Sequence, residues 1–173
     1  VFLRRGFYRL EGSLRLPVGV TLRGDYDPQK PRESSVLSVV GGKGDENGAP
    51  TVSMPAGSGL VGLVFYYPEQ SSSSPVAYPW TIKSTPPTDA LPNENQTVSD
   101  CTIVNAWRGI SIGPERSELH LIRRTRICAL KTGVALDTIY DTGRLDGILV
   151  SPEVWVESGF GDSPTREVLR NCL

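Results

Sequence analysis

Apolar residues along the chain fall into short runs that alternate with polar residues and are separated by Gly, Pro, Asn and Asp. Alternation with a period of two is typical of half-buried β-strands, and the separating residues favour turns. A helical period is nearly absent, and only Thr165 to Arg170 has the pattern of one or two helical turns. The pattern therefore predicts an all-β fold with many short strands.

One four-place apolar pattern recurs at nearly regular intervals. Its copies start 38, 24 and 23 residues apart and read Leu60-x-x-Leu63-x-Phe65, Val98-x-x-Cys101-x-Ile103, Ile122-x-x-Thr125-x-Ile127 and Leu145-x-x-Ile148-x-Val150. A second pattern, Ile110-Ser111-Ile112-Gly113, returns 24 residues later as Val134-Ala135-Leu136-Asp137. A spacing in the twenties corresponds to one turn of a solenoid, so two patterns with a common period predict a coil with two or three parallel strands per turn.

The repeat predicts a right-handed, single-stranded parallel β-helix that occupies residues 1–173 as one unit. Intervals longer than one coil require loop insertions, and we place these at about 25–50 and 69–97, where Gly, Ser, Pro and Asn accumulate. Tyr78 to Ser84 is expected to return to the coil as a strand. Because the chain opens directly on a strand-like segment, we expect a partial β-helix from a longer protein.

Stacking of successive coils brings equivalent positions together at the spacing of paired strands, about 4.8 Å. We therefore expect Asp100 to lie against Arg124, and Arg123 against Asp146, as pairs of opposite charge on adjacent coils. A single apolar ladder is expected in the interior, made of Leu63, Ile103, Ile127 and Ile148.

Composition narrows the function classes. The formal net charge of -1 does not favour a nucleic-acid partner, and the sequence has no apolar run long enough for a membrane span. The three cysteines match no zinc or redox spacing, and we predict no metal site from the sequence.

The beginning of the chain resembles the opening coils of the pectate lyase superfamily. The resemblance lies in Val1 to Leu10 and in Leu16-Pro17-Val18-Gly19-Val20-Thr21-Leu22-Arg23-Gly24, and it continues in residues 101–110 and 131–134. Arg5 departs from the pattern, because the family usually has Pro or a small residue there. The resemblance implies a β-helix fold. The paired-aspartate, His-Gly and Arg-x-Lys motifs of polygalacturonases are missing, so it implies no particular active site.

Candidate chemistry concentrates between two coils, where Asp137 and Asp141 provide two carboxylates and Arg144 a guanidinium. Sugar hydrolysis requires two carboxylates, one as acid and one as base or nucleophile. We therefore predict Asp137 and Asp141 as catalytic residues, with Arg144 binding the substrate. The alternative is that Asp141 and Gly143 only shape a turn.

Three further side chains are predicted to contact a saccharide. His120 is the only histidine and alternates with apolar neighbours, so we expect it to point outward; the alternative is an incidental surface residue. Tyr66 and Trp107 are expected to be exposed and able to stack on sugar rings.

Two functional hypotheses follow. The first is a secreted or cell-surface carbohydrate-active enzyme, a glycoside hydrolase or polysaccharide lyase acting on a plant or microbial polysaccharide; no cofactor is expected unless a lyase reaction adds calcium. The second is a non-catalytic β-helix, such as a carbohydrate-binding module, an adhesin or a tailspike-like protein, which the missing catalytic motifs favour. Both rest on analogy with a fold. In either case we expect an oligosaccharide or polysaccharide partner and self-association through the ends of the β-helix.

Overall fold

The computed structural model describes residues 1–173 except 72, 86–92, 152, 156–165 and 169–173. The described part is all-β, and its one helical element is the 3-10 turn η1 (Pro31–Glu33). Within these residues no helix has the length and apolarity that a membrane span needs.

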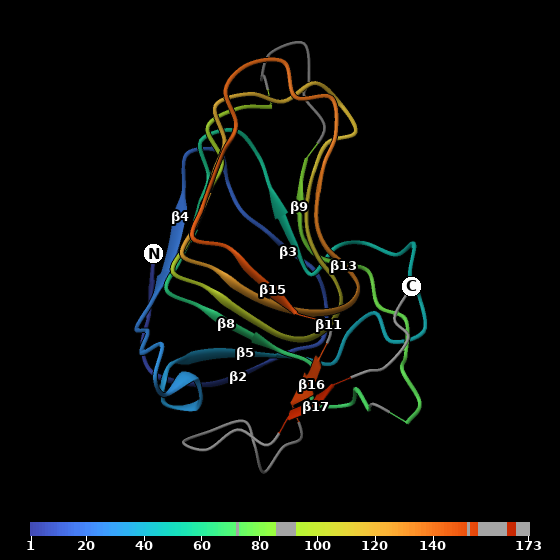
Figure 1. Ribbon diagram of the computed structural model, residues 1–173. Coiled ribbons are helices and arrows are strands. Elements are labelled where there is room, and N and C mark those ends of the chain that lie inside the picture. Colours follow the sequence, from blue (N-terminus) through green and yellow to red (C-terminus); the bar gives the residue numbers. More distant parts are fainter. Residues whose placement is uncertain (72, 86–92, 152, 156–165, 169–173) are drawn as a thin grey trace.

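Most strands pair in parallel in two curled sheets (Figure 1). The first sheet, which we call sheet A, consists in spatial order of β1 (Phe2–Leu3), β4 (Thr21–Gly24), β7 (Gly59–Val61), β10 (Thr97–Ser99), β12 (Leu121–Arg123) and β14 (Arg144–Asp146). Every pairing in this sheet is parallel.

The second sheet, sheet B, has two arms joined through long strands. One arm contains β2 (Gly6–Leu10), β5 (Ser35–Val39), β8 (Val64–Tyr66) and β15 (Leu149–Ser151), and the other contains β3 (Leu14–Arg15), β6 (Val52–Met54) and β9 (Trp80–Ser84). Strands β11 (Thr102–Ile112) and β13 (Arg126–Leu136) run through both arms. A separate antiparallel pair is formed by β16 (Glu153–Trp155) and β17 (Arg166–Val168).

Each turn of the chain passes through sheet A and then through the two arms of sheet B, so the stacked turns outline a triangle (Figure 1). We name the corners in chain order. The first corner joins sheet A to the β2–β5–β8 arm, the second joins the two arms, and the third returns the chain to sheet A at the top of Figure 1.

The strand register confirms the repeat read from the sequence. The starting positions of the four-place pattern pair successively as Leu60–Val98, Val98–Ile122 and Ile122–Leu145. Its last positions pair as Phe65–Ile103, Ile103–Ile127 and Ile127–Val150. The second pattern also aligns, because Ile110, Ser111 and Ile112 pair with Val134, Ala135 and Leu136.

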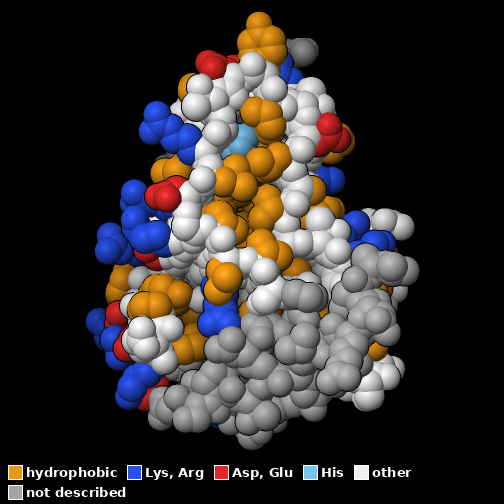
Figure 2. Space-filling model, viewed as in Figure 1, with side chains coloured by type: hydrophobic (Ala, Val, Ile, Leu, Met, Phe, Trp, Pro, Cys, Tyr) orange, Lys and Arg blue, Asp and Glu red, His pale blue; other side chains and the backbone are white. Residues whose placement is uncertain are grey.

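The single interior ladder predicted from Leu63, Ile103, Ile127 and Ile148 is two ladders. Ile103 and Ile127 are paired neighbours, whereas Leu63 and Ile148 each lie two residues earlier in their coils. Leu63, Ile103 and Ile127 are fully buried, and Ile148 packs partly buried against the same core. Leu145, Leu149 and Val150 remain about half exposed at the face seen in Figure 2, where hydrophobic side chains gather.

Two other expectations require correction. The segment 25–50 is not one loop, because residues 35–39 form the buried strand β5 between β2 and β8. The helical pattern at residues 165–170 is also wrong where the structure describes it, since Arg166–Val168 is a strand. The strand expected at 78–84 is confirmed as β9. Residues 86–92 of the second insertion lie outside the described residues.

Two corners are built on columns of residues with positive φ. At the first corner the column is Gly62, Asp100, Arg124 and Gly147, and at the third it is Gly19, Gly57, Asn95 and Leu119. The strand register places the members of each column above one another. Left-handed backbone at the same position of successive coils lets each coil turn without shifting the strands that follow.

We expect Ile103→Ala to lower the free energy of unfolding by about 2–5 kcal/mol, because it leaves a cavity between Phe65 and Ile127. The measurement is urea unfolding followed by circular dichroism. Leu149→Ala is the control and should cost much less, since Leu149 is 55% exposed. A cost for Ile103→Ala below about 1 kcal/mol would contradict the interior position.

Candidate functional site

Two adjacent pockets follow the first corner along the stack. A pocket of about 420 Å³ is lined from the first four coils by Phe2, Arg23, Gly24, Asp25, Tyr26, Pro28, Val61, Gly62 and Asp100. A second of about 300 Å³ continues over the last three coils and is lined by Tyr26, Pro28, Thr102, Arg124, Thr125, Arg126, Gly147 and Leu149. Because Tyr26 and Pro28 line both, we treat the two as one surface, the corner groove. With strands about 4.8 Å apart, it crosses six coils over roughly 24 Å.

Charged and hydroxylated side chains line the corner groove. Arg124 donates from Nε and Nη2 to the two carboxylate oxygens of Asp100, at 2.6 and 2.8 Å, which confirms the first of the two predicted pairs. These hydrogen bonds lower the pKa of Asp100. For the second pair, the register places Arg123 beside Asp146. Figure 2 shows Lys and Arg side chains along one side of the stack.

Tyr26 is the central aromatic group of the groove. Its hydroxyl lies 2.7 Å from Thr102 Oγ1 on β11, which fixes the ring across the middle of the stack. Burial raises the pKa of the Tyr26 phenol. The ring therefore offers a neutral hydroxyl and an aromatic face, the combination suited to contacts with sugars.

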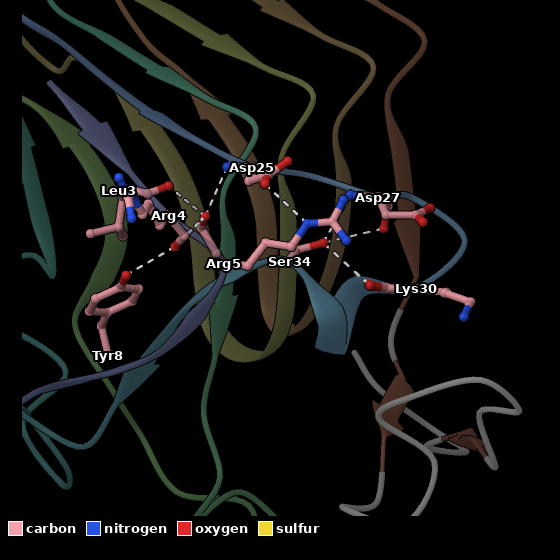
Figure 3. A network of polar contacts seen from close by, with 9 residues as sticks. Leu3, Arg4, Arg5, Tyr8, Asp25, Asp27, Lys30 and Ser34 are labelled. Carbon is pink, nitrogen blue, oxygen red and sulfur yellow. Dashed lines mark hydrogen bonds and ion pairs between the residues drawn. The ribbon is translucent and has the colours of Figure 1, made fainter.

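The segment 25–34 that carries Tyr26 is held by buried serines (Figure 3). Ser34 Oγ accepts the Asp27 N–H at 2.9 Å, and Ser35 Oγ accepts the Asp25 N–H at 2.8 Å. Ser35 Oγ also lies 2.8 Å from the Leu3 carbonyl oxygen of the first coil. Outside this core, Arg5 Nε donates to Asp25 at 3.0 Å. What the sequence indicated as an insertion is thus a fixed wall of the groove.

Asp137 and Asp141, the predicted catalytic pair, lie at the third corner, away from the corner groove. Both are exposed and make local hydrogen bonds. Thr138 Oγ1 donates to Asp137 Oδ1 at 3.1 Å, and the Thr142 N–H donates to Asp141 Oδ1 at 2.6 Å. The second contact is typical of an aspartate that shapes a turn.

The structure brings two of the predicted substrate-binding residues, His120 and Arg144, to one shallow pocket of about 390 Å³ on sheet A. The remaining lining residues are Asn95, Thr97, Leu119, Leu121 and Thr142. Arg144 is exposed there, and its backbone N–H donates to the His120 carbonyl oxygen at 2.9 Å.

The expectation that His120 points outward is wrong, because the residue is 1% exposed. Ile122 pairs with the interior positions Val98 and Leu145, and His120, two residues earlier, lies on the same inner side of the strand. Leu119 and Leu121 misled the sequence interpretation, since they are the outward-facing neighbours. Burial lowers the pKa of His120.

The expectation that Tyr66 is exposed is also wrong. Its outward direction is right, because Phe65 beside it is an interior residue, but Tyr66 is only 4% exposed. It packs on the outer side of sheet B in a second apolar cluster with Val36, Val64, Val104 and Cys128, against which Tyr26 also packs.

Trp107 is partly buried against the main core, and the Lys131 ammonium lies 5.7 Å from the centre of its ring. Lys131 also donates to Glu46, and this hydrogen bond lowers the pKa of the Glu46 carboxyl. On the neighbouring strand, Arg108 stacks over Trp80 at 4.8 Å and pairs with Glu46 at 3.5 Å. Both indole rings therefore already carry cations.

Nucleophilic and metal chemistry find little in the described part of the chain. Burial raises the pKa of the Cys101 thiol to about 12, which keeps it protonated at neutral pH. Among the described residues, no three His, Cys, Asp or Glu side chains gather where they could hold a metal ion.

Comparisons of the chain with protein-family models, with curated proteins and with solved structures gave no match.

We expect acid to destabilise the protein through His120. Its pKa in the folded chain lies below the ordinary value of 6.5, so the unfolded chain binds the proton first as pH falls. The free energy of unfolding should therefore be highest above about pH 6.5 and fall between about pH 6.5 and pH 5.

Urea unfolding at several pH values measures this effect. His120→Gln has a polar side chain that does not titrate, so the difference between it and the wild type isolates the histidine from the carboxylates. The same pH dependence in both proteins would contradict the prediction.

Proposed function

We propose that the chain is a right-handed parallel β-helix of the pectate-lyase-like kind, belonging to a secreted or cell-surface protein that binds and degrades polysaccharide. The fold proposal is supported by parallel pairing between successive coils and by the 23- and 24-residue spacing of the last coils. The resemblance of residues 1–24 to the opening coils of the pectate lyase superfamily supports it independently.

The corner groove is the observation that carries the functional proposal. An elongated groove along successive coils fits an extended polymer better than a small compact ligand. Its aromatic residue Tyr26, its hydroxyls on Thr102 and Thr125 and its guanidinium on Arg124 supply the groups that bind sugars through stacking and hydrogen bonds. The groove also lies on a rigid sheet, which reduces the loss of entropy on binding.

A non-catalytic, carbohydrate-binding role is the second candidate, and one observation favours it. Both carboxylates of the groove are already paired, Asp25 with Arg5 and Asp100 with Arg124. A carboxylate held ionised in this way is a poor general acid. Catalysis by the described residues would then fall to Asp137 and Asp141, which contact the end of a bound chain only if it reaches the third corner. A lyase reaction there would add calcium as a cofactor.

We expect Arg124→Gln to weaken polysaccharide binding by about tenfold, equivalent to about 1.4 kcal/mol, because a charged hydrogen-bond donor leaves the groove. Affinity electrophoresis against a panel of acidic and neutral polysaccharides measures the change. Arg9→Gln is the matched control, since Arg9 is also exposed and ion-paired, with Glu11 on β2. Equal affinity of the wild type and both variants would contradict binding in the groove.

If the protein degrades polysaccharide through the predicted pair, Asp137→Asn and Asp141→Asn should each lower the release of reducing ends by about 10²-fold or more. Glu33→Gln, which removes an exposed carboxylate from η1, should leave the rate unchanged. Folded Asp variants with unchanged rates would show that these residues are not catalytic. Binding without any turnover by the wild type would favour the second candidate.

A further inference from the structure

The interior of the third corner is polar, unlike the rest of the core. Five polar side chains from three consecutive coils lie there, each at most 3% exposed: Ser84, Asn93, Gln96, Ser117 and His120. Buried polar groups cost free energy unless they form hydrogen bonds, so this cluster, which we call the polar corner, needs an account of its partners.

Backbone hydrogen bonds place the members of the polar corner above one another. The Leu121 N–H donates to the Gln96 carbonyl oxygen at 2.9 Å, which stacks His120 on Gln96. The Glu118 N–H donates to the Asn93 carbonyl oxygen at 3.1 Å, which stacks Ser117 on Asn93. Two inward columns therefore run side by side through two coils.

Part of the cluster is paired internally. Gln96 Nε2 donates to Asn93 Oδ1, and Asn93 Nδ2 donates to Ser84 Oγ at 3.5 Å. Ser84 Oγ also accepts the Gly113 N–H at 3.0 Å. These contacts join the two columns and fix the orientation of the Asn93 and Gln96 amides.

Four buried atoms of the cluster have no hydrogen-bond partner among the described residues: Gln96 Oε1, Ser117 Oγ, and Nδ1 and Nε2 of His120. A neutral imidazole offers one donor and one acceptor, a hydroxyl offers both, and the amide oxygen only accepts. Water supplies two donors and two acceptors, and buried waters in proteins typically make about three hydrogen bonds to such groups.

We infer that the polar corner is a binding site for an ordered internal water, which donates to Gln96 Oε1 and bridges it to Ser117 and the His120 imidazole. Gly143 forms the cover of the site in the last coil. A Cβ at this position would overlap His120 Nε2, so the glycine serves close packing on the ring, and no positive φ is involved.

The site can be tested by counting long-lived internal waters with oxygen-17 magnetic relaxation dispersion. Gln96→Met keeps the length of the side chain and removes the acceptor, so it should lower the count by about one. Gln70→Met is the matched control, because the Gln70 amide is buried but already paired with Val76 N and O. That variant should keep the wild-type count.

A second measurement needs no variant and so does not depend on folding of Gln96→Met. In the wild type, the amide protons of Gln96 and the imidazole proton of His120 should show cross-peaks to water with the sign of a slowly tumbling, protein-bound molecule. Absence of these cross-peaks, an unchanged water count in Gln96→Met, or a direct hydrogen bond between Gln96 and His120 in a high-resolution crystal structure would overturn the inference.

Discussion

The structure depends on the left-handed backbone at two of its three corners. A coil in which each strand pairs with its equivalent in the next coil must bend at the same residue every time, or the register is lost. Gly62 and Gly147 adopt φ of 67° and 62° at no steric cost, whereas Asp100 and Arg124 do so with side chains, at roughly 1–2 kcal/mol each. The ion pair between these two side chains offsets part of that cost.

Alternation and period together indicated most of this architecture. Where Val98, Ile122 and Leu145 recur at even intervals, the sequence predicted both the strands and their register, because each coil buries the same positions. The earlier coils were harder to delimit, since long connections separate their strands. A shared signal exists nevertheless: Pro17 and Pro55 each precede a left-handed glycine by two residues, at equivalent places in adjacent coils.

The candidate site was much less accessible to sequence reasoning. The corner groove collects residues from six coils, so its members are far apart in sequence and carry no common motif. Side-chain direction caused the errors at His120 and Tyr66. For His120, the side of the strand was judged from its neighbours and not from the repeat. For Tyr66 the direction was right, but a second layer of side chains over the sheet leaves no trace in alternation.

The second corner has a consequence for how such chains can diverge. Between β5 and β6 and between β8 and β9 it accommodates connections of 12 and 13 residues, whereas β11 and β13 pass it with only a bend. The strands on both sides keep their pairing in all these coils. Length at this corner is therefore decoupled from the register, so it can take up insertions or deletions during evolution, and foreign peptides could be grafted there without disturbing the scaffold.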